Sequence, residues 1–198
     1  FTGYFSARST EHVFRVNCIS MRTGAWFQSI ASGQAGDHRT TSGLLREAEI
    51  RNALRRSIPG VKDVHVPLSG GSALTAFVSM HQTRPGEAKQ AIPITMGVDH
   101  YLKFVIIVDD DVDVFNESDV IWAVSTRVQA DRDLVIISGS LGAILDPSAT
   151  EQGLTAKLGI DATKPIGDPF AERLLMNSKR MEWAHDLMNR LTAGHTAV

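Results

Sequence analysis

Cysteine is almost absent from this sequence: Cys18 is the only one among 198 residues. A single thiol excludes an internal disulfide and cannot assemble a cysteine-rich zinc site. The seven histidines include no pair at the i, i+4 spacing by which one helix binds a metal ion. We therefore expect a protein of the reducing cytoplasm, with no metal site built from this chain alone.

Long hydrophobic runs and blocks of one charge are also missing. The apolar run at residues 104–108 is far shorter than the roughly 20 residues of a membrane-spanning helix. The 20 basic and 22 acidic residues give a net charge of −2 and form no long block. We therefore expect no membrane and no nucleic-acid partner. With 43% hydrophobic residues, the composition is that of a globular protein.

A nucleotide-binding glycine fingerprint is a third absence. The glycine-bearing stretches at residues 69–72 and 138–142 do not lead from a strand into a helix, as phosphate-binding loops do. We predict turns at both stretches. An unrelated nucleotide-binding α/β domain is therefore a disfavoured alternative.

The start of the chain lacks both an initiator methionine and the features of a signal peptide. It reads Phe1-Thr2-Gly3-Tyr4, with no basic segment ahead of an apolar one. We expect that a preceding part of the protein is missing from this sequence.

An acidic cluster, Asp109-Asp110-Asp111-Val112-Asp113, follows the apolar run. Its spacing imitates the first three ligands of a calcium loop. Such a loop needs Gly at its sixth position and Glu at its twelfth, where this sequence has Val114 and Val120. We interpret the cluster as structural: its carboxylates cap the following turn and helix, or pair with Arg127 or Arg132.

The first 41 residues predict a β-hairpin followed by a polar loop. Two apolar stretches, at residues 13–19 and 25–30, flank the turn-prone Arg22-Thr23-Gly24. Residues 31–43 are rich in Ser, Gly and Thr. We place a domain boundary in this loop, between residues 1–41 and the part that follows.

Residues 42–168 predict an α/β domain. Apolar residues at helical spacing predict a helix that begins with Ser42 as its N-cap and ends at Pro59-Gly60. Period-two alternation and β-branched runs predict strands at residues 61–66, 73–80, 104–108 and 134–137. Residues 85–102 stay ambiguous because Pro93 interrupts a helical pattern.

The second half of this domain predicts a parallel βαβ unit. A strand at residues 104–108 precedes a helix capped by Asn116 or Ser118, and a second strand follows at residues 134–137. After Pro147 the pattern predicts irregular structure to about residue 169. The last part, residues 169–198, predicts an amphipathic helix over 172–191.

Several blocks resemble the UbiD family of decarboxylases, in the same order along the chain. The most specific block covers residues 104–132, a strand that ends in an acidic run, followed by a helix containing Val-Ile-Trp-Ala and then Thr-Arg. Further blocks that match are Leu145-Asp146-Pro147-Ser148, residues 153–165, Thr2-Gly3-Tyr4, residues 13–19 and Ala48-Glu49-Ile50. The resemblance thus covers most of residues 1–165.

The resemblance implies both a fold and a reaction. The fold is a UbiD C-terminal-like α/β domain with a mixed sheet, preceded by the last strands of a flavin-binding split barrel. A C-terminal helix follows, and we expect it to be exchanged or packed between protomers. The reaction is the reversible decarboxylation of an aromatic or α,β-unsaturated carboxylic acid on prenylated FMN, with manganese and potassium. The catalytic Arg and Glu residues and the metal ligands of the family lie upstream. We therefore expect no catalytic residue and no metal ligand in this chain, and no activity of the chain alone.

The resemblance also suggests four site residues. Ser32 corresponds to a pocket residue at the flavin edge, and Ser42 and Ala143 fall near positions that face the substrate. Lys103 resembles a lysine that some members place against the flavin. An ordinary solvated lysine at the start of a strand is the alternative for Lys103.

The partners implied are the upstream flavin-binding domain of the same protein, a second copy in a dimer or hexamer, and a flavin prenyltransferase that supplies the cofactor. A different class of function stays open, a non-catalytic assembly or regulatory subunit of a UbiD-like complex. An upstream sequence with the catalytic Arg and Glu residues would favour the enzyme.

Overall fold

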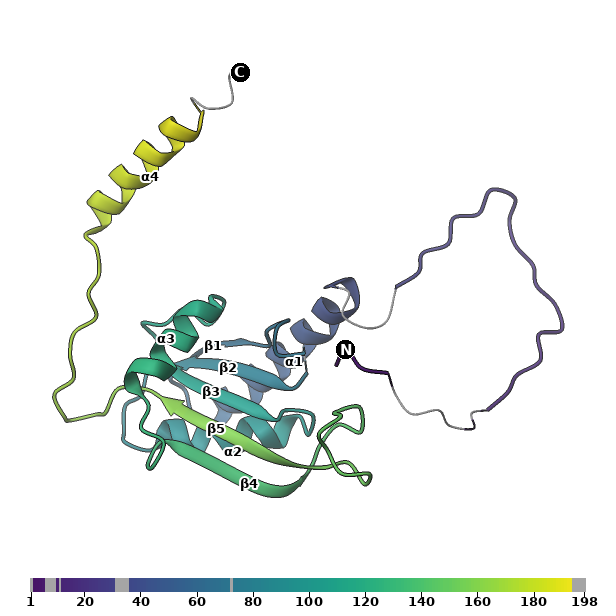
Figure 1. Cartoon of the computed structure of the whole chain (residues 1–198), viewed down its shortest axis with the longest axis horizontal. Helices are drawn as coiled ribbons and strands as arrows, with labels where there is room; N and C mark the ends of the chain where they lie inside the picture. Colours follow the sequence, from purple (N-terminus) through teal and green to yellow (C-terminus); the bar gives the residue numbers. More distant parts are fainter. Residues whose placement is uncertain (1, 6–9, 11, 31–35, 72, 194–198) are drawn as a thin grey trace. The chain divides into compact units, whose positions relative to one another are not determined.

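A five-stranded mixed sheet forms the centre of the protein in a computed structural model, which describes residues 2–5, 10, 12–30, 36–71 and 73–193. The strand order is β1-β2-β3-β5-β4 (Figure 1). The three inner strands are parallel, and β1 and β4 are antiparallel edge strands. The strands are β1 (Val61–His65), β2 (Thr75–Met80), β3 (Phe104–Asp109), β4 (Leu134–Leu141) and β5 (Leu154–Ala162). The predicted α/β class with a mixed sheet is confirmed.

Two helices, α1 (Gly36–Ser57) and α2 (Glu87–Val98), cover one face of the sheet. Ile50 of α1 and Ile92 of α2 are fully buried in the core on this face. The contact between α2 and β5 is close, since a Cβ atom on Gly159 would lie 2.2 Å from the Ile92 side chain. Glycine at this position therefore allows the helix to pack directly on the strand.

The opposite face carries α3 (Glu117–Arg127) and the loop before it. Val112 and Val114 of the loop are buried with Val120 of α3 against β3. The Asn116 side chain caps the helix by accepting a hydrogen bond from the backbone N–H of Ser118 at 3.2 Å. Strand β3 is therefore covered on both faces. The Asn116 alternative for the helix cap is confirmed.

The predicted parallel βαβ unit is wrong in its last strand. The strand after α3 is β4, which runs antiparallel to its neighbour at the edge of the sheet. The parallel partner of β3 is β5, in a segment predicted to be irregular. Gly153, Gly159 and the polar Lys157 mask the strand pattern there. Lys157 is nevertheless 4% exposed, because its Nζ donates to the carbonyl of His100 at 2.9 Å.

Three local predictions also change. The first helix begins at Gly36, so Ser42 lies inside α1 and is not its N-cap. Residues 138–141 continue β4, with a bulge between Ile137 and Ser140, where a turn was predicted. The ambiguous segment around Pro93 forms α2. The stretch at residues 69–71 does form turns, as predicted.

The hairpin predicted for the N-terminal segment does not form. Among described residues 12–30 the Arg22–Ala25 turn closes with a 3.1 Å hydrogen bond, but no strand flanks it. Apolar side chains such as Phe14 and Trp26 are 84% and 97% exposed. An isolated hairpin is only marginally stable without a sheet to cover it. Membership of a flavin-binding barrel therefore stays a prediction for this segment.

Residues 1–166 and 167–198 form two separate compact units. The second contains α4 (Ser178–Ala193), which starts later than predicted because Asn177 accepts from the backbone N–H of Lys179 at 3.0 Å, as an N-cap does. Met181, Trp183, Leu187, Met188 and Leu191 of α4 are all between 40% and 66% exposed. In the described part of the chain, no helix is both long enough and apolar enough to cross a membrane.

Candidate functional site

The parallel strands divide the polar residues of the domain between two edges of the sheet. We call the edge where β2, β3 and β5 end the carboxyl edge, and the edge where they begin the amino edge. The acidic cluster lies at the carboxyl edge. Lys103, which immediately precedes β3, lies at the amino edge.

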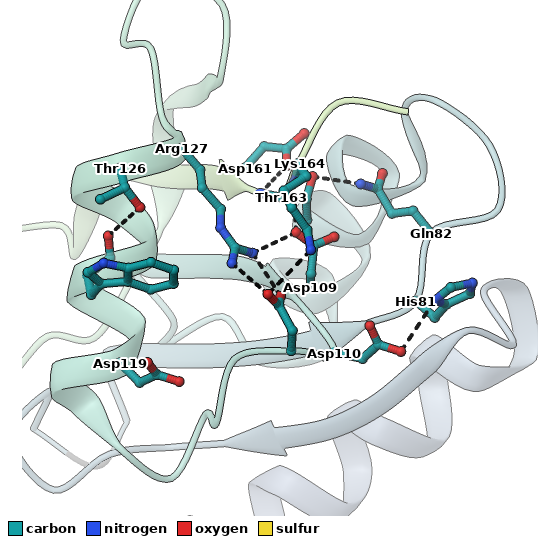
Figure 2. Close-up of polar contacts among 12 residues, drawn as sticks. His81, Gln82, Asp109, Asp110, Asp119, Thr126, Arg127, Asp161, Thr163 and Lys164 are labelled. Atoms are coloured by element: carbon teal, nitrogen blue, oxygen red, sulfur yellow. Dashed lines mark hydrogen bonds and ion pairs between the residues drawn. The ribbon is translucent and has the colours of Figure 1, made fainter. Parts of the chain in front are cut away.

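Arg127, the last residue of α3, organises the carboxyl edge. Its guanidinium donates to Asp109 at 2.7 Å and to both carboxylate oxygens of Asp111 at 3.0 and 2.9 Å (Figure 2). Lys164 adds a backbone N–H to Asp109 at 2.7 Å and its ammonium group to Asp111 at 3.3 Å. The Arg127 side chain is 1% exposed and stacks 5.2 Å from the Trp122 ring. The cluster thus joins the ends of β3 and α3 to the residues after β5.

Burial and pairing shift the pKa values of Asp109 and Asp111 in opposite directions. Burial raises the pKa of Asp109, although the Lys164 N–H and the charge of Arg127 oppose this effect. Burial works in the same direction on Asp111, but hydrogen bonds and charge from Arg127 and Lys164 outweigh it and lower the pKa of this carboxyl. Both carboxylates are thus committed to contacts within the protein.

The rest of the carboxyl edge is also engaged in internal contacts. Gln82 donates to the Thr163 hydroxyl at 2.6 Å, and the exposed His81 lies 3.3 Å from Asp110 (Figure 2). Among the described residues no group of three His, Cys, Asp or Glu side chains could hold a metal ion. The predicted pairing with Arg127 is confirmed, whereas Arg132 pairs with Asp133 instead. The carboxyl edge is therefore a structural cluster.

At the amino edge, Lys103 is held by the protein at both its backbone and its side chain. Its N–H donates to Leu74 and its carbonyl accepts from Leu158, each at 2.8 Å. Its ammonium group donates to Asp146 at 2.9 Å and also to the Ser148 hydroxyl. The side chain is only 19% exposed. The alternative of a freely solvated Lys103 does not describe this structure, and a contact with flavin stays a prediction.

Asp146 connects Lys103 to Ala143. The backbone N–H of Asp146 donates to the Ala143 carbonyl at 2.9 Å, which closes a turn after β4. Ala143 is 2% exposed within this chain, so almost none of its surface is open to a substrate here. The structure therefore brings Ala143 and Lys103 together, and the predicted pocket role of Ala143 stays a prediction.

Ser42 connects to the same edge through Arg46. The Ser42 hydroxyl accepts from Arg46 Nε at 3.4 Å, and Arg46 forms an ion pair with Asp99. Burial lowers the pKa of Arg46, which also lies 5.2 Å from the Tyr101 ring. Asp99 accepts from the Tyr101 N–H at 2.9 Å, which fixes the residues before Lys103. Ser32 lies outside the described residues.

An open groove of about 560 Å³ borders this edge. Phe104, the neighbour of Lys103, lines it together with Leu74 and Thr75 of the adjacent strand and residues 68–71 of the loop before it. The sequence assigned no role in the site to Asp146, Ser148, Arg46 or Asp99. The Asp-Pro-Ser order at residues 146–148 is a turn signal that could have found the first two.

Comparison with known proteins places this domain in a family. The family model of the 3-octaprenyl-4-hydroxybenzoate carboxy-lyase C-terminal domain, UbiD_C, matches residues 39–162. The anhydromevalonate phosphate decarboxylase of Aeropyrum pernix is 41% identical over 156 residues, which is 79% of this chain and 35% of that protein. The gallate decarboxylase of Lactiplantibacillus plantarum is 36% identical over 180 residues, or 84% and 36% of the two chains. This chain thus spans about a third of the length of these relatives.

Solved structures agree with this assignment. The UbiD-class enzyme HmfF from Pelotomaculum thermopropionicum, in complex with FMN, has a TM-score of 0.70 and 34% identity over 75% of this chain and 34% of its own. The 3,4-dihydroxybenzoic acid decarboxylase of Enterobacter cloacae has a TM-score of 0.69 and 32% identity, over 76% and 34% of the two chains. The family model alone spans more than half of the present sequence. The chain therefore belongs to the UbiD family and contains its C-terminal domain.

Proposed function

We propose that this chain is the C-terminal part of a UbiD-type carboxy-lyase. In this proposal the whole enzyme uses prenylated FMN to decarboxylate, reversibly, an aromatic or α,β-unsaturated carboxylic acid. The observation that carries the proposal is the family match over residues 39–162. Relatives named as decarboxylases and HmfF structures with FMN and with prenylated FMN support it.

The residues present fit one part of a flavin site. Loss of carbon dioxide leaves a carbanion-like centre, and the bound flavin would supply the electron sink for it. Lys103 would supply a positive charge beside the groove at the amino edge, held in place by Asp146. Phe104 and Leu74 line this open groove and would exclude water once another part of the protein closes it, which strengthens electrostatic contacts inside a closed site.

The residues present do not fit a manganese site. Such a site needs several oxygen or nitrogen ligands, and the described residues contain no suitable group of three. We propose that the manganese and potassium ligands, like the catalytic Arg and Glu residues, belong to the upstream part of the protein. No step of the reaction is assigned to a metal in this chain.

The 198-residue chain alone should then be inactive. The test is to co-express it, and separately the full gene product, with a flavin prenyltransferase. Bound flavin is measured by ultraviolet-visible spectra and carbon dioxide release with aromatic and unsaturated acids. We expect flavin and turnover only from the full product. Turnover by the short chain would contradict the division of labour, and a full product without turnover would favour the non-catalytic assembly subunit.

We further propose that the protein forms a homo-oligomer, a dimer or hexamer, through α4. The apolar side chains along this helix, including Trp183 and Leu187, would be covered by another protomer. Relatives include an evolved dimeric form of HmfF. Light scattering on a chain that ends at Asp168 should show a smaller assembly than the full chain, and an unchanged mass would reject exchange of α4.

A further inference from the structure

The Asp146 carboxylate forms more contacts at the amino edge than its role in a turn requires. Its Oδ2 accepts from Lys103, and its Oδ1 accepts from both the N–H and the hydroxyl of Ser148, at 3.0 and 2.8 Å. The side chain is 6% exposed. One carboxylate therefore joins the start of β3 to the loop between β4 and β5, which consists of residues 142–153.

The β4–β5 loop is otherwise held by its own backbone. Gly142 N–H donates to Gly153 at 2.8 Å, Ala149 N–H donates to Asp146 at 3.0 Å, and Thr150 N–H donates to Leu154 at 2.9 Å. Among the described residues, two side-chain contacts tie this loop to Lys103: its ion pair with Asp146 and the hydrogen bond that it donates to the Ser148 hydroxyl. The loop keeps its shape by itself, whereas the position of the Lys103 ammonium group depends on Asp146.

We propose that Asp146 is a positioning residue, which fixes the Lys103 ammonium group at the amino edge beside the groove lined by Phe104. This inference rests on the proposed function, because it assumes that Lys103 faces the flavin or the substrate. Asp146 acts through Lys103 and not on the reacting atoms. A lysine side chain has about four rotatable bonds, so its ammonium group samples many positions without its carboxylate partner.

The test combines an NMR signal of Lys103, which requires neither cofactor nor substrate, with enzyme kinetics. In the 198-residue chain, the ammonium protons of Lys103 are observed by nitrogen-15 NMR in Asp146→Asn, in Ser148→Ala and in a control, Glu151→Gln. Glu151 is exposed in the same loop, so this control makes the same charge change away from Lys103. We expect the protected ammonium signal to persist in the wild type and in Glu151→Gln and to be lost in Asp146→Asn.

The kinetic arm uses the full-length enzyme and a double-mutant cycle. Misplacement of a positioned group costs up to about a hundredfold in rate, so Asp146→Asn should lower kcat about ten- to a hundredfold with little change in KM. Ser148→Ala leaves the ion pair between Lys103 and Asp146 in place, so it should disturb folding less than Asp146→Asn does. It should lower kcat about fivefold. In a Lys103→Gln background the Asp146→Asn loss should shrink to less than about twofold.

Three outcomes distinguish the possibilities. Equal losses from Asp146→Asn in the presence and absence of Lys103 would overturn the positioning role, because the effect would then be independent of the ammonium group. Persistence of the protected Lys103 signal in Asp146→Asn would overturn it as well. A wild-type full-length protein without turnover would refute the proposed function alone, since the NMR result would still decide whether Asp146 holds Lys103.

Discussion

Both edges of the sheet contain a buried or partly buried ion pair, but the two pairs hold different parts of the protein. At the carboxyl edge, the buried Arg127 pairs with two carboxylates and joins three elements of the core. At the amino edge, Lys103 pairs with one carboxylate on a loop, and its neighbour Phe104 lines an open groove. Ion pairing by itself thus does not mark a functional site. A groove borders each edge, and Asp110 and Asp111 line the one at the carboxyl edge. The two edges differ in what the ion pair holds, which is packed elements of the core at the carboxyl edge and a loop at the amino edge.

The strongest test of this difference is Arg127→Met. The change removes the buried cation that Asp109 and Asp111 share and leaves Lys164, which is partly exposed, as their remaining counter-charge. Breaking a buried pair in this way costs about 3 to 5 kcal/mol of unfolding free energy. Urea unfolding of the chain measures this loss of unfolding free energy. The control is Arg132→Met, which removes an exposed ion pair and should cost less than about 1 kcal/mol. A loss below about 1 kcal/mol for Arg127→Met would show that the carboxyl edge is not structural.

A smaller loss of unfolding free energy, which depends on pH, is expected for Asp146→Asn. Burial works against the charge of Asp146, but hydrogen bonds from Lys103 and Ser148 outweigh it and hold its pKa below the ordinary value of 3.8. A carboxyl with a depressed pKa stabilises the fold above its unfolded pKa, and this contribution is lost as the pH falls through the folded pKa. At pH 7 we expect a loss of about 1.5 to 3 kcal/mol.

The sign of the pH dependence provides the check. The stability difference between wild type and Asp146→Asn should be constant above pH 5 and shrink as the pH falls below 3.8, measured by urea unfolding at each pH. A difference that grows in acid would contradict the ion pair with Lys103.

The smallest effect is expected for Gly142→Ala, at the base of the β4–β5 loop. The added Cβ would lie 2.6 Å from Cγ2 of Thr155, so the two strands must separate slightly. The severe clash is with this methyl group, while Thr155 Cβ at 3.1 Å and the Gly153 carbonyl oxygen at 3.4 Å are only tight contacts. The cost should therefore be at the low end of overpacking, about 1 kcal/mol. Thr155→Ser removes that methyl group and should restore part of the loss in thermal unfolding. If Thr155→Ser does not raise the thermal stability of Gly142→Ala, the destabilisation does not come from the contact with the Thr155 methyl group.

Local patterns in the sequence predicted those parts of the fold in which apolar residues are buried and charged residues pair with partners in the same segment of the chain. The apolar run of β3, the Asn116 cap and the pairing of Asp109 with Arg127 all follow from short-range pattern and charge. The inner strand β5 was missed in part because the charged Lys157 is buried in it. Its charge is satisfied by the carbonyl of His100, 57 residues away, which no local pattern reveals.

The candidate site shows the same limit. The resemblance to the UbiD family singled out Lys103 and Ala143, which the structure joins through Asp146. Asp146 itself was part of a matching block but carried no predicted role, because its partner Lys103 lies 43 residues earlier. Contacts across such separations depend on the strand order, and that order was predicted incorrectly at β4 and β5.

Hydrogen–deuterium exchange of the full-length protein, with and without bound prenylated FMN, tests most directly whether the amino edge faces the cofactor. We predict slower exchange on cofactor binding in residues 99–104 and 142–150, with residues 110–116 and 163–165 at the carboxyl edge unchanged. Protection confined to the carboxyl edge would contradict the assignment of the amino edge as the functional side of this domain.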